Sequence, residues 1–229
     1  GVVRDTPLVN KTVIGEELTN YGLPDGRYML CQLIPGLYFV QEIRNVLNIQ
    51  SDQEFTFENL SYLASKSNYP HFADLSSQIL TMIESTILQR IVEYFKQKQL
   101  APPETPGDFV RCIYRSIAEE YRTVINSIGL ATKKKYSQIY IGGGAVNDVF
   151  FCQLISDVTD MEVIAIATEI SAWGNLIGQF ITLKEIDTSD AELIVDQSIR
   201  ARVYLPNHDW YRRNEVWKNT FRSSHPILK

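Results

Sequence analysis

The chain has 229 residues, of which 45% are hydrophobic and 21% are charged, a composition typical of a globular domain. Its net charge of −5 argues against a general affinity for the phosphate backbone of nucleic acids. Charged residues, proline or glycine interrupt every apolar stretch before it reaches membrane-spanning length. We therefore expect neither nucleic acid nor a membrane as a partner.

The cysteines and histidines suggest neither a disulfide framework nor a metal site. Three cysteines lie in apolar runs without C-x-x-C spacing, a pattern typical of reduced thiols in a cytoplasmic protein. The three histidines lie far apart in the sequence and lack the spacing of metal ligands. We therefore expect a cytoplasmic protein whose own side chains bind no metal.

The first third of the chain has the pattern of strands and turns. Val2 and Val3 form a short β-branched stretch. Residues 18–22 and 27–31 flank Pro24-Asp25-Gly26, where proline presets φ and glycine accepts a positive φ. This pattern predicts an antiparallel hairpin.

Helical periodicity dominates the middle of the chain. Apolar residues recur at helical spacing over about 37–47, 55–63, 76–97 and 108–128. The proline-rich segment 101–107 separates the last two of these helices. We expect 76–97 to be one long amphipathic helix and Asp108 to lie near the cap of the next one.

The final third alternates strand and helix. We expect a buried strand at 138–141, a helix at about 147–158, a second strand at 162–166 and a helix at about 170–184. Strands joined through a helix form a parallel pair with a right-handed crossover. Residues 190–229 are expected to form a helical tail packed on the same domain, so that 1–229 is a single domain.

The order of these elements, an antiparallel hairpin first and a parallel βαβα unit at the end, is that of ribonuclease-H-like domains. We therefore predict an α/β fold of the ribonuclease-H-like, actin-like ATPase class, with a mixed sheet flanked by helices. Fold alone does not determine function.

Three consecutive glycines, Gly142, Gly143 and Gly144, separate the 138–141 strand from its helix. Glycine permits a positive φ and close approach of the backbone to a ligand, and the following helix offers free N–H groups. Asn147 is predicted either to cap that helix or to present its amide to a ligand. The pattern matches neither G-x-G-x-x-G nor the P-loop, so a tight turn without a ligand is an equal alternative.

Several segments together resemble the C-terminal half of the rhamnulokinases, which belong to the FGGY carbohydrate kinases. The matching segments are Thr19–Gly22, Asp25–Tyr28, Gln32–Gln41, Pro103–Ser116, Gly142–Asn147 and Glu169–Asn175. They occur in the family's order, and the resemblance extends over about residues 1–187.

The resemblance implies ATP-dependent phosphorylation of a ketose such as L-rhamnulose, in a cleft between two actin-like domains. It places Gly142, Gly143, Gly144 and Asn147 along the adenosine and Gln41 in the nucleotide site. Magnesium would be held by the ATP or ADP phosphates and by water, as is usual for this ion. The ketose would bind mainly through a domain that precedes this chain.

The chain also departs from the family pattern. Leu33 replaces an asparagine eight positions before Gln41, which removes one expected polar contact with the nucleotide. The resemblance places the family's catalytic aspartate upstream of Gly1, so we expect no catalytic residue here and an inactive isolated chain. Asp148 and Glu169 are interpreted as helix-start or capping groups.

Two alternatives have different consequences for function. Leu33 favours a non-catalytic relative that serves as a regulatory or structural module. An interaction domain would instead use the tail aromatic residues Trp210, Tyr211 and Trp217, although packing of the tail on the body also explains them. The sequence does not predict the oligomeric state.

Overall fold

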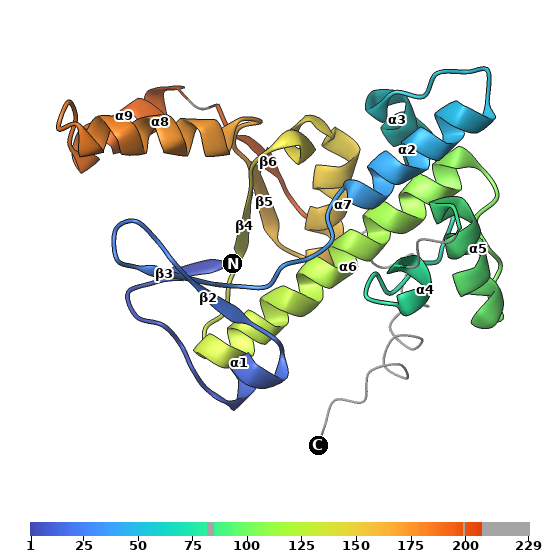
Figure 1. Ribbon diagram of the computed structural model, residues 1–229, viewed down its shortest axis with the longest axis horizontal. Coiled ribbons are helices and arrows are strands. Elements are labelled where there is room, and N and C mark those ends of the chain that lie inside the picture. Colours follow the sequence, from blue (N-terminus) through green and yellow to red (C-terminus); the bar gives the residue numbers. More distant parts are fainter. Residues whose placement is uncertain (82–84, 199, 208–229) are drawn as a thin grey trace.

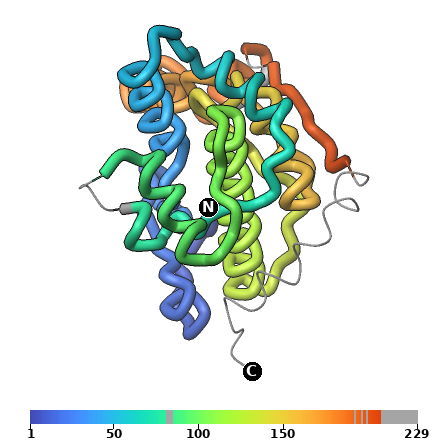
Figure 2. Tube along the Cα trace, turned by 90° about the vertical axis from the view of Figure 1, so that its right-hand side faces the viewer, coloured from blue at the N-terminus to red at the C-terminus, as the bar shows by residue number. Residues whose placement is uncertain are grey.

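A computed structural model describes residues 1–81, 85–198 and 200–207. Its central element is helix α6 (Pro106–Thr132), which runs diagonally through the molecule in Figure 1. Four other helices contact α6: α1 (Lys11–Gly15), α2 (Tyr38–Gln50), α3 (Phe57–Lys66) and α7 (Val149–Thr159). Figure 2 shows α2 and α7 on opposite sides of α6.

The strands form two three-stranded sheets, and no pairing between the sheets occurs in the described residues. In the first, β3 (Tyr28–Cys31) lies between β1 (Val2–Arg4) and β2 (Thr19–Gly22), antiparallel to both. The predicted hairpin is therefore confirmed.

The second sheet is mixed. β4 (Gln138–Ile141) pairs parallel with β5 (Glu162–Ala165), and β6 (Arg202–Tyr204) pairs antiparallel with β5. The βαβα order predicted for the final third is confirmed, because α7 joins β4 to β5 and α8 (Ile170–Thr182) follows β5. The chain thus has the predicted α/β class, with a mixed sheet and flanking helices.

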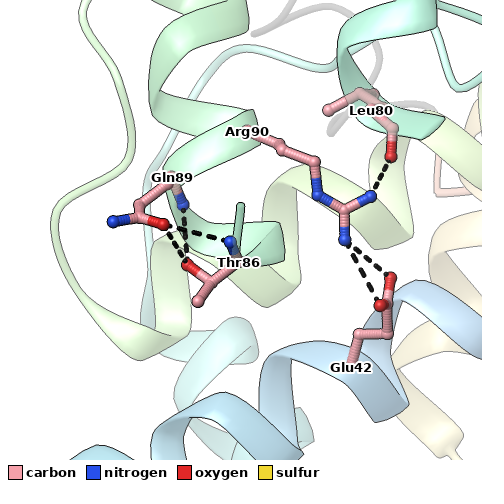
Figure 3. A network of polar contacts seen from close by, with 5 residues as sticks. All are labelled: Glu42, Leu80, Thr86, Gln89 and Arg90. Atoms are coloured by element: carbon pink, nitrogen blue, oxygen red, sulfur yellow. Dashed lines mark hydrogen bonds and ion pairs between the residues drawn. The ribbon is translucent and has the colours of Figure 1, made fainter. Parts of the chain in front are cut away.

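The prediction of a single long helix at 76–97 is wrong. The structure has two helices, α4 (Gln78–Thr81) and α5 (Ile87–Gln97). Thr86 caps α5: its Oγ1 accepts from the Gln89 N–H at 3.4 Å, and Gln89 Oε1 accepts from the Thr86 N–H at 3.0 Å (Figure 3). This reciprocal capping box starts a new helix where the apolar period alone suggested continuity.

One α-helix and one strand of the described residues were not anticipated. α1 is a short helix in the part of the chain expected to contain strands and turns, and Asn10 caps it while its amide donates to the Ala131 carbonyl oxygen at 3.1 Å. β6 lies in the segment expected to be a helical tail. Helix α9 (Thr188–Ser198) precedes β6, and the tail aromatic residues at 210, 211 and 217 lie outside the described residues.

The main hydrophobic core lies between α6 and its neighbours. α3 and α6 approach so closely that a Cβ on Gly107 would lie 2.6 Å from the Leu63 carbonyl oxygen. The three cysteines are buried and form no disulfide. α8 differs from the other long helices because none of its residues is buried. In the described part of the chain, no helix is both long and apolar enough to cross a membrane.

Candidate functional site

The glycine loop, defined as Gly142, Gly143 and Gly144, follows the carboxyl end of β4. A Cβ on Gly142 would lie 2.5 Å from the Ile170 side chain, which leaves no room for a larger residue. Gly143 has φ +86°, a conformation that favours glycine, and its N–H donates to the Ala167 carbonyl oxygen at 2.9 Å. Packing against Ile170 therefore favours glycine at Gly142, and the backbone conformation favours it at Gly143.

Open space lies beside the second half of this loop. A Cβ on Gly143 or Gly144 would meet no other atom within 4 Å. Gly144 begins the short 3₁₀ helix η1 (Gly144–Asn147), and the buried side chain of Val146 anchors it. The loop thus presents bare backbone to its open side.

Asn147 does not cap the helix that follows. Asp148 caps α7 instead, because its Oδ1 accepts from the Phe151 N–H at 2.8 Å. This confirms the interpretation of Asp148 as a capping group and leaves the Asn147 side chain exposed at the end of η1. Its Oδ1 accepts from the Thr168 hydroxyl at 3.3 Å, so Asn147 joins the loop to the segment after β5.

Asp148 also makes contacts that sequence reasoning missed. Its Oδ1 accepts from the Ser61 hydroxyl of α3 at 2.7 Å, and its Oδ2 accepts from the Tyr114 hydroxyl of α6. Tyr114 is 2% exposed, and burial raises the pKa of its hydroxyl. The partners lie 87 and 34 positions from Asp148, so no local pattern predicts them.

Gln41 lies on a different element from the glycine loop. It is an exposed residue in the first turn of α2, and α2 packs on α5 and α6, whereas the loop is continuous with α7. Leu33, in the segment between β3 and α2, is 82% exposed. Gly142, Gly143, Gly144 and Asn147 lie within six consecutive residues of the chain, whereas Gln41 comes from a separate helix.

The small residues of α8 have no packing role. A Cβ on Gly174 or Gly178 would meet nothing within 4 Å. Glu169 occupies the N-cap position of α8 but makes no capping hydrogen bond through its side chain. Among the described residues, no group of three or more histidine, cysteine, aspartate or glutamate side chains is arranged to hold a metal ion.

The family model that describes the C-terminal domain of the FGGY carbohydrate kinases matches residues 2–183. The chain belongs to the FGGY family of carbohydrate kinases. The glycine loop, Asn147 and Gln41 all lie within the matched region.

Curated relatives include two rhamnulokinases. The chain is 29% identical over 205 residues to rhamnulokinase from Oceanobacillus iheyensis. The aligned region covers 89% of the chain and 43% of the relative. It is 30% identical over 209 residues to rhamnulokinase from Bacillus subtilis, and the aligned region covers 90% of the chain and 42% of that relative. The chain thus spans less than half the length of these relatives.

Solved structures of the family share the fold. Xylulose kinase from Rhodospirillum rubrum matches with a TM-score of 0.60 and 14% identity, covering 99% of the chain and 45% of that structure. Gluconate kinase from Lactobacillus acidophilus matches with a TM-score of 0.63 and 14% identity, covering 97% and 44%. Glycerol kinase from Plasmodium falciparum, solved with ADP, matches with a TM-score of 0.56 and 12% identity, covering 89% of the chain and 40% of that structure.

Proposed function

We propose that the chain is the nucleotide-binding part of a rhamnulokinase-like enzyme, which transfers the γ-phosphoryl group of ATP to a ketose such as L-rhamnulose. The observation that supports it most is the glycine loop. Gly143 holds a positive φ at the end of a parallel strand, and the space beside Gly143 and Gly144 is open. Ligands of α/β folds gather at the carboxyl ends of such strands.

The residues of the loop suit the adenosine of a nucleotide. Bare backbone at Gly143 and Gly144 would let a flat ring or a ribose lie against it without a side chain between them. Asn147 is exposed beside them and offers an amide donor, while its oxygen already accepts from Thr168. In this proposal Gln41 contacts the same nucleotide from α2.

Magnesium would be bound through the nucleotide rather than by the chain. Mg²⁺ commonly keeps several waters and takes its remaining ligands from phosphates. Because phosphoryl transfer depends on positioning and charge stabilisation by both sides of a cleft, we propose that this chain alone transfers no phosphate.

The test is a calorimetric titration with ADP and Mg²⁺, together with a coupled kinase assay on ATP and L-rhamnulose. The proposal predicts weak but saturable ADP binding and no phosphorylated sugar. Absence of ADP binding at millimolar concentration would contradict the nucleotide-binding assignment. Phosphate transfer by the chain itself would contradict the assignment of catalysis to another part of the enzyme.

A non-catalytic module is the second candidate, and Leu33 is the observation that favours it. Leu33 is 82% exposed where the family has an asparagine. The variant Leu33→Asn distinguishes the two. If the chain retains a nucleotide site, the added amide strengthens ADP binding; if the chain is a module that has lost the site, neither form binds ADP.

A further inference from the structure

Asp148 ties the glycine loop to two helices of the core. A helix cap needs only the hydrogen bond that Asp148 Oδ1 accepts from the Phe151 N–H. The bonds from Ser61 and Tyr114 go beyond capping and connect the end of η1 to α3 and α6. We call these three residues the Ser61–Asp148–Tyr114 bridge.

Both hydroxyl donors of the bridge come from firmly packed positions. The Tyr114 ring is buried, with its centroid 4.6 Å from that of Phe151. Ser61 lies on α3, which contacts α6 so closely at Gly107 that no side chain fits between them. The carboxylate therefore cannot move far without losing bonds to a rigid pair of helices.

The charge of Asp148 argues against direct contact with nucleotide phosphates. A carboxylate repels a phosphate, and the three hydrogen bonds that Asp148 accepts all come from the chain itself. Any influence on a nucleotide must therefore act through the position of the loop.

We propose that Asp148 is a positioning residue for the nucleotide site, and that the Ser61–Asp148–Tyr114 bridge holds the glycine loop in its binding conformation. This inference rests on the proposed function, because the fixed loop matters to a ligand that lies on it. A loop ordered before the ligand arrives loses less conformational entropy on binding. Cutting the bridge should therefore weaken ADP binding while α7 keeps its cap.

The test uses substitutions that leave both the loop and the α7 cap intact. Ser61→Thr keeps the hydroxyl. Ser61→Val has nearly the same shape as the threonine variant but lacks the hydroxyl. Tyr114→Phe removes the second donor. Each variant is titrated with ADP and Mg²⁺, and amide hydrogen exchange of Gly143 and Val146 is measured without ligand, with Arg90 on α5 as the internal reference.

The bridge predicts that Ser61→Thr binds ADP like the original chain. Ser61→Val and Tyr114→Phe should each weaken ADP binding about tenfold, as expected for the loss of one hydrogen bond to a charged group. The Gly143 and Val146 amides should exchange faster in these two variants, while the Arg90 amide is unchanged.

Other outcomes separate this inference from the proposed function. Unchanged ADP affinity in Ser61→Val and Tyr114→Phe would overturn the positioning role and leave the nucleotide site intact. If the original chain does not bind ADP, the proposed function fails. The exchange data alone then decide whether the bridge anchors the loop. Faster loop exchange would still support the bridge as the anchor of the loop, and unchanged exchange would overturn it.

Discussion

Arg90 on α5 forms an ion pair with Glu42 on α2, with 3.2 Å between Arg90 Nη2 and Glu42 Oε2 (Figure 3). Its Nη1 also donates to the Leu80 carbonyl oxygen at 2.5 Å, so one guanidinium joins α2, α4 and α5. The side chains are 9% and 26% exposed, respectively. Since Glu42 follows Gln41, this ion pair stabilises the helix that carries a proposed nucleotide contact.

We predict that Arg90→Met lowers the free energy of unfolding by about 3 kcal/mol, because it leaves Glu42 and the Leu80 carbonyl without their partner. Urea unfolding followed by circular dichroism measures the change. Arg27→Met is the control, since the Asp25–Arg27 pair is exposed on the hairpin turn and should contribute nothing measurable. Equal effects of the two substitutions would contradict a structural role for the Arg90–Glu42 pair.

The start of α6 gives a prediction of pH dependence. Thr105 caps α6, and Asp108 accepts from the Thr105 N–H at 3.0 Å and from the Ser67 hydroxyl at 2.5 Å. Burial opposes ionisation, but these hydrogen bonds lower the pKa of Asp108 below its ordinary value. A carboxyl group with a lowered pKa in the folded state stabilises the fold at neutral pH, and this contribution is lost as the pH falls through that pKa.

Asp108→Asn should therefore cost about 1 kcal/mol near pH 7, and the difference from the original chain should shrink on acidification to about pH 3. Denaturant unfolding at several pH values measures it. Asp157→Asn provides a control of opposite sign, because burial raises the pKa of Asp157. There the original chain should gain stability relative to the variant as the pH falls. The same trend in both variants would contradict the assignment.

Local patterns were sufficient for much of the fold. The Pro24-Asp25-Gly26 turn predicted the hairpin, and the strand at 138–141 was found with the observed bounds. That strand was expected to be buried, which is wrong, because its side chains are exposed or half-buried and Tyr140 is 64% exposed. The boundary at Thr86 was also readable, because Thr86 and Gln89 have capping-box spacing, but the continuous apolar period outweighed it. β6 is a short strand whose pairing with β5 depends on tertiary contact.

The candidate site was only partly accessible from sequence. The glycines were noticed because glycine adopts a positive φ more readily than other residues, and Gly143 does have φ +86°. Asp148 was recognised as a cap, a local feature, but its bonds to Ser61 and Tyr114 join distant parts of the chain. Gln41 was connected to the loop only by resemblance to a family, and no local physical pattern links the two.

The thiols should be unreactive in the folded chain. Cys31, Cys112 and Cys152 are buried, and burial raises the pKa of Cys152 to about 11 and that of Cys112 further. Since the thiolate is the reactive form, we predict slow modification by an aromatic disulfide reagent in native buffer and rapid reaction of all three thiols in denaturant. Rapid modification of the native chain would contradict the burial of these residues.

The isolated chain should bind a hydrophobic dye through α8. Leu176 and Phe180 are 48% and 41% exposed, on a helix with no buried residue. Replacing both by glutamine should reduce the fluorescence of bound anilinonaphthalene sulfonate and change stability by less than about 0.5 kcal/mol each. Ile49→Gln on α2 is the control, because Ile49 is 83% exposed and should change neither quantity. A large loss of stability in the α8 variant would show that this face is packed.

Titration of the chain with ADP and Mg²⁺ beside Gly143→Val tests the proposed nucleotide site most directly. Gly26→Val is a matched control: Gly26 has φ +83°, close to the +86° of Gly143, and both have open space at the Cβ position. The two substitutions thus impose similar backbone strain, one at the loop and one at the hairpin turn. We predict that ADP binding is lost in Gly143→Val and retained in Gly26→Val. Binding that survives in Gly143→Val would contradict a nucleotide lying on the glycine loop.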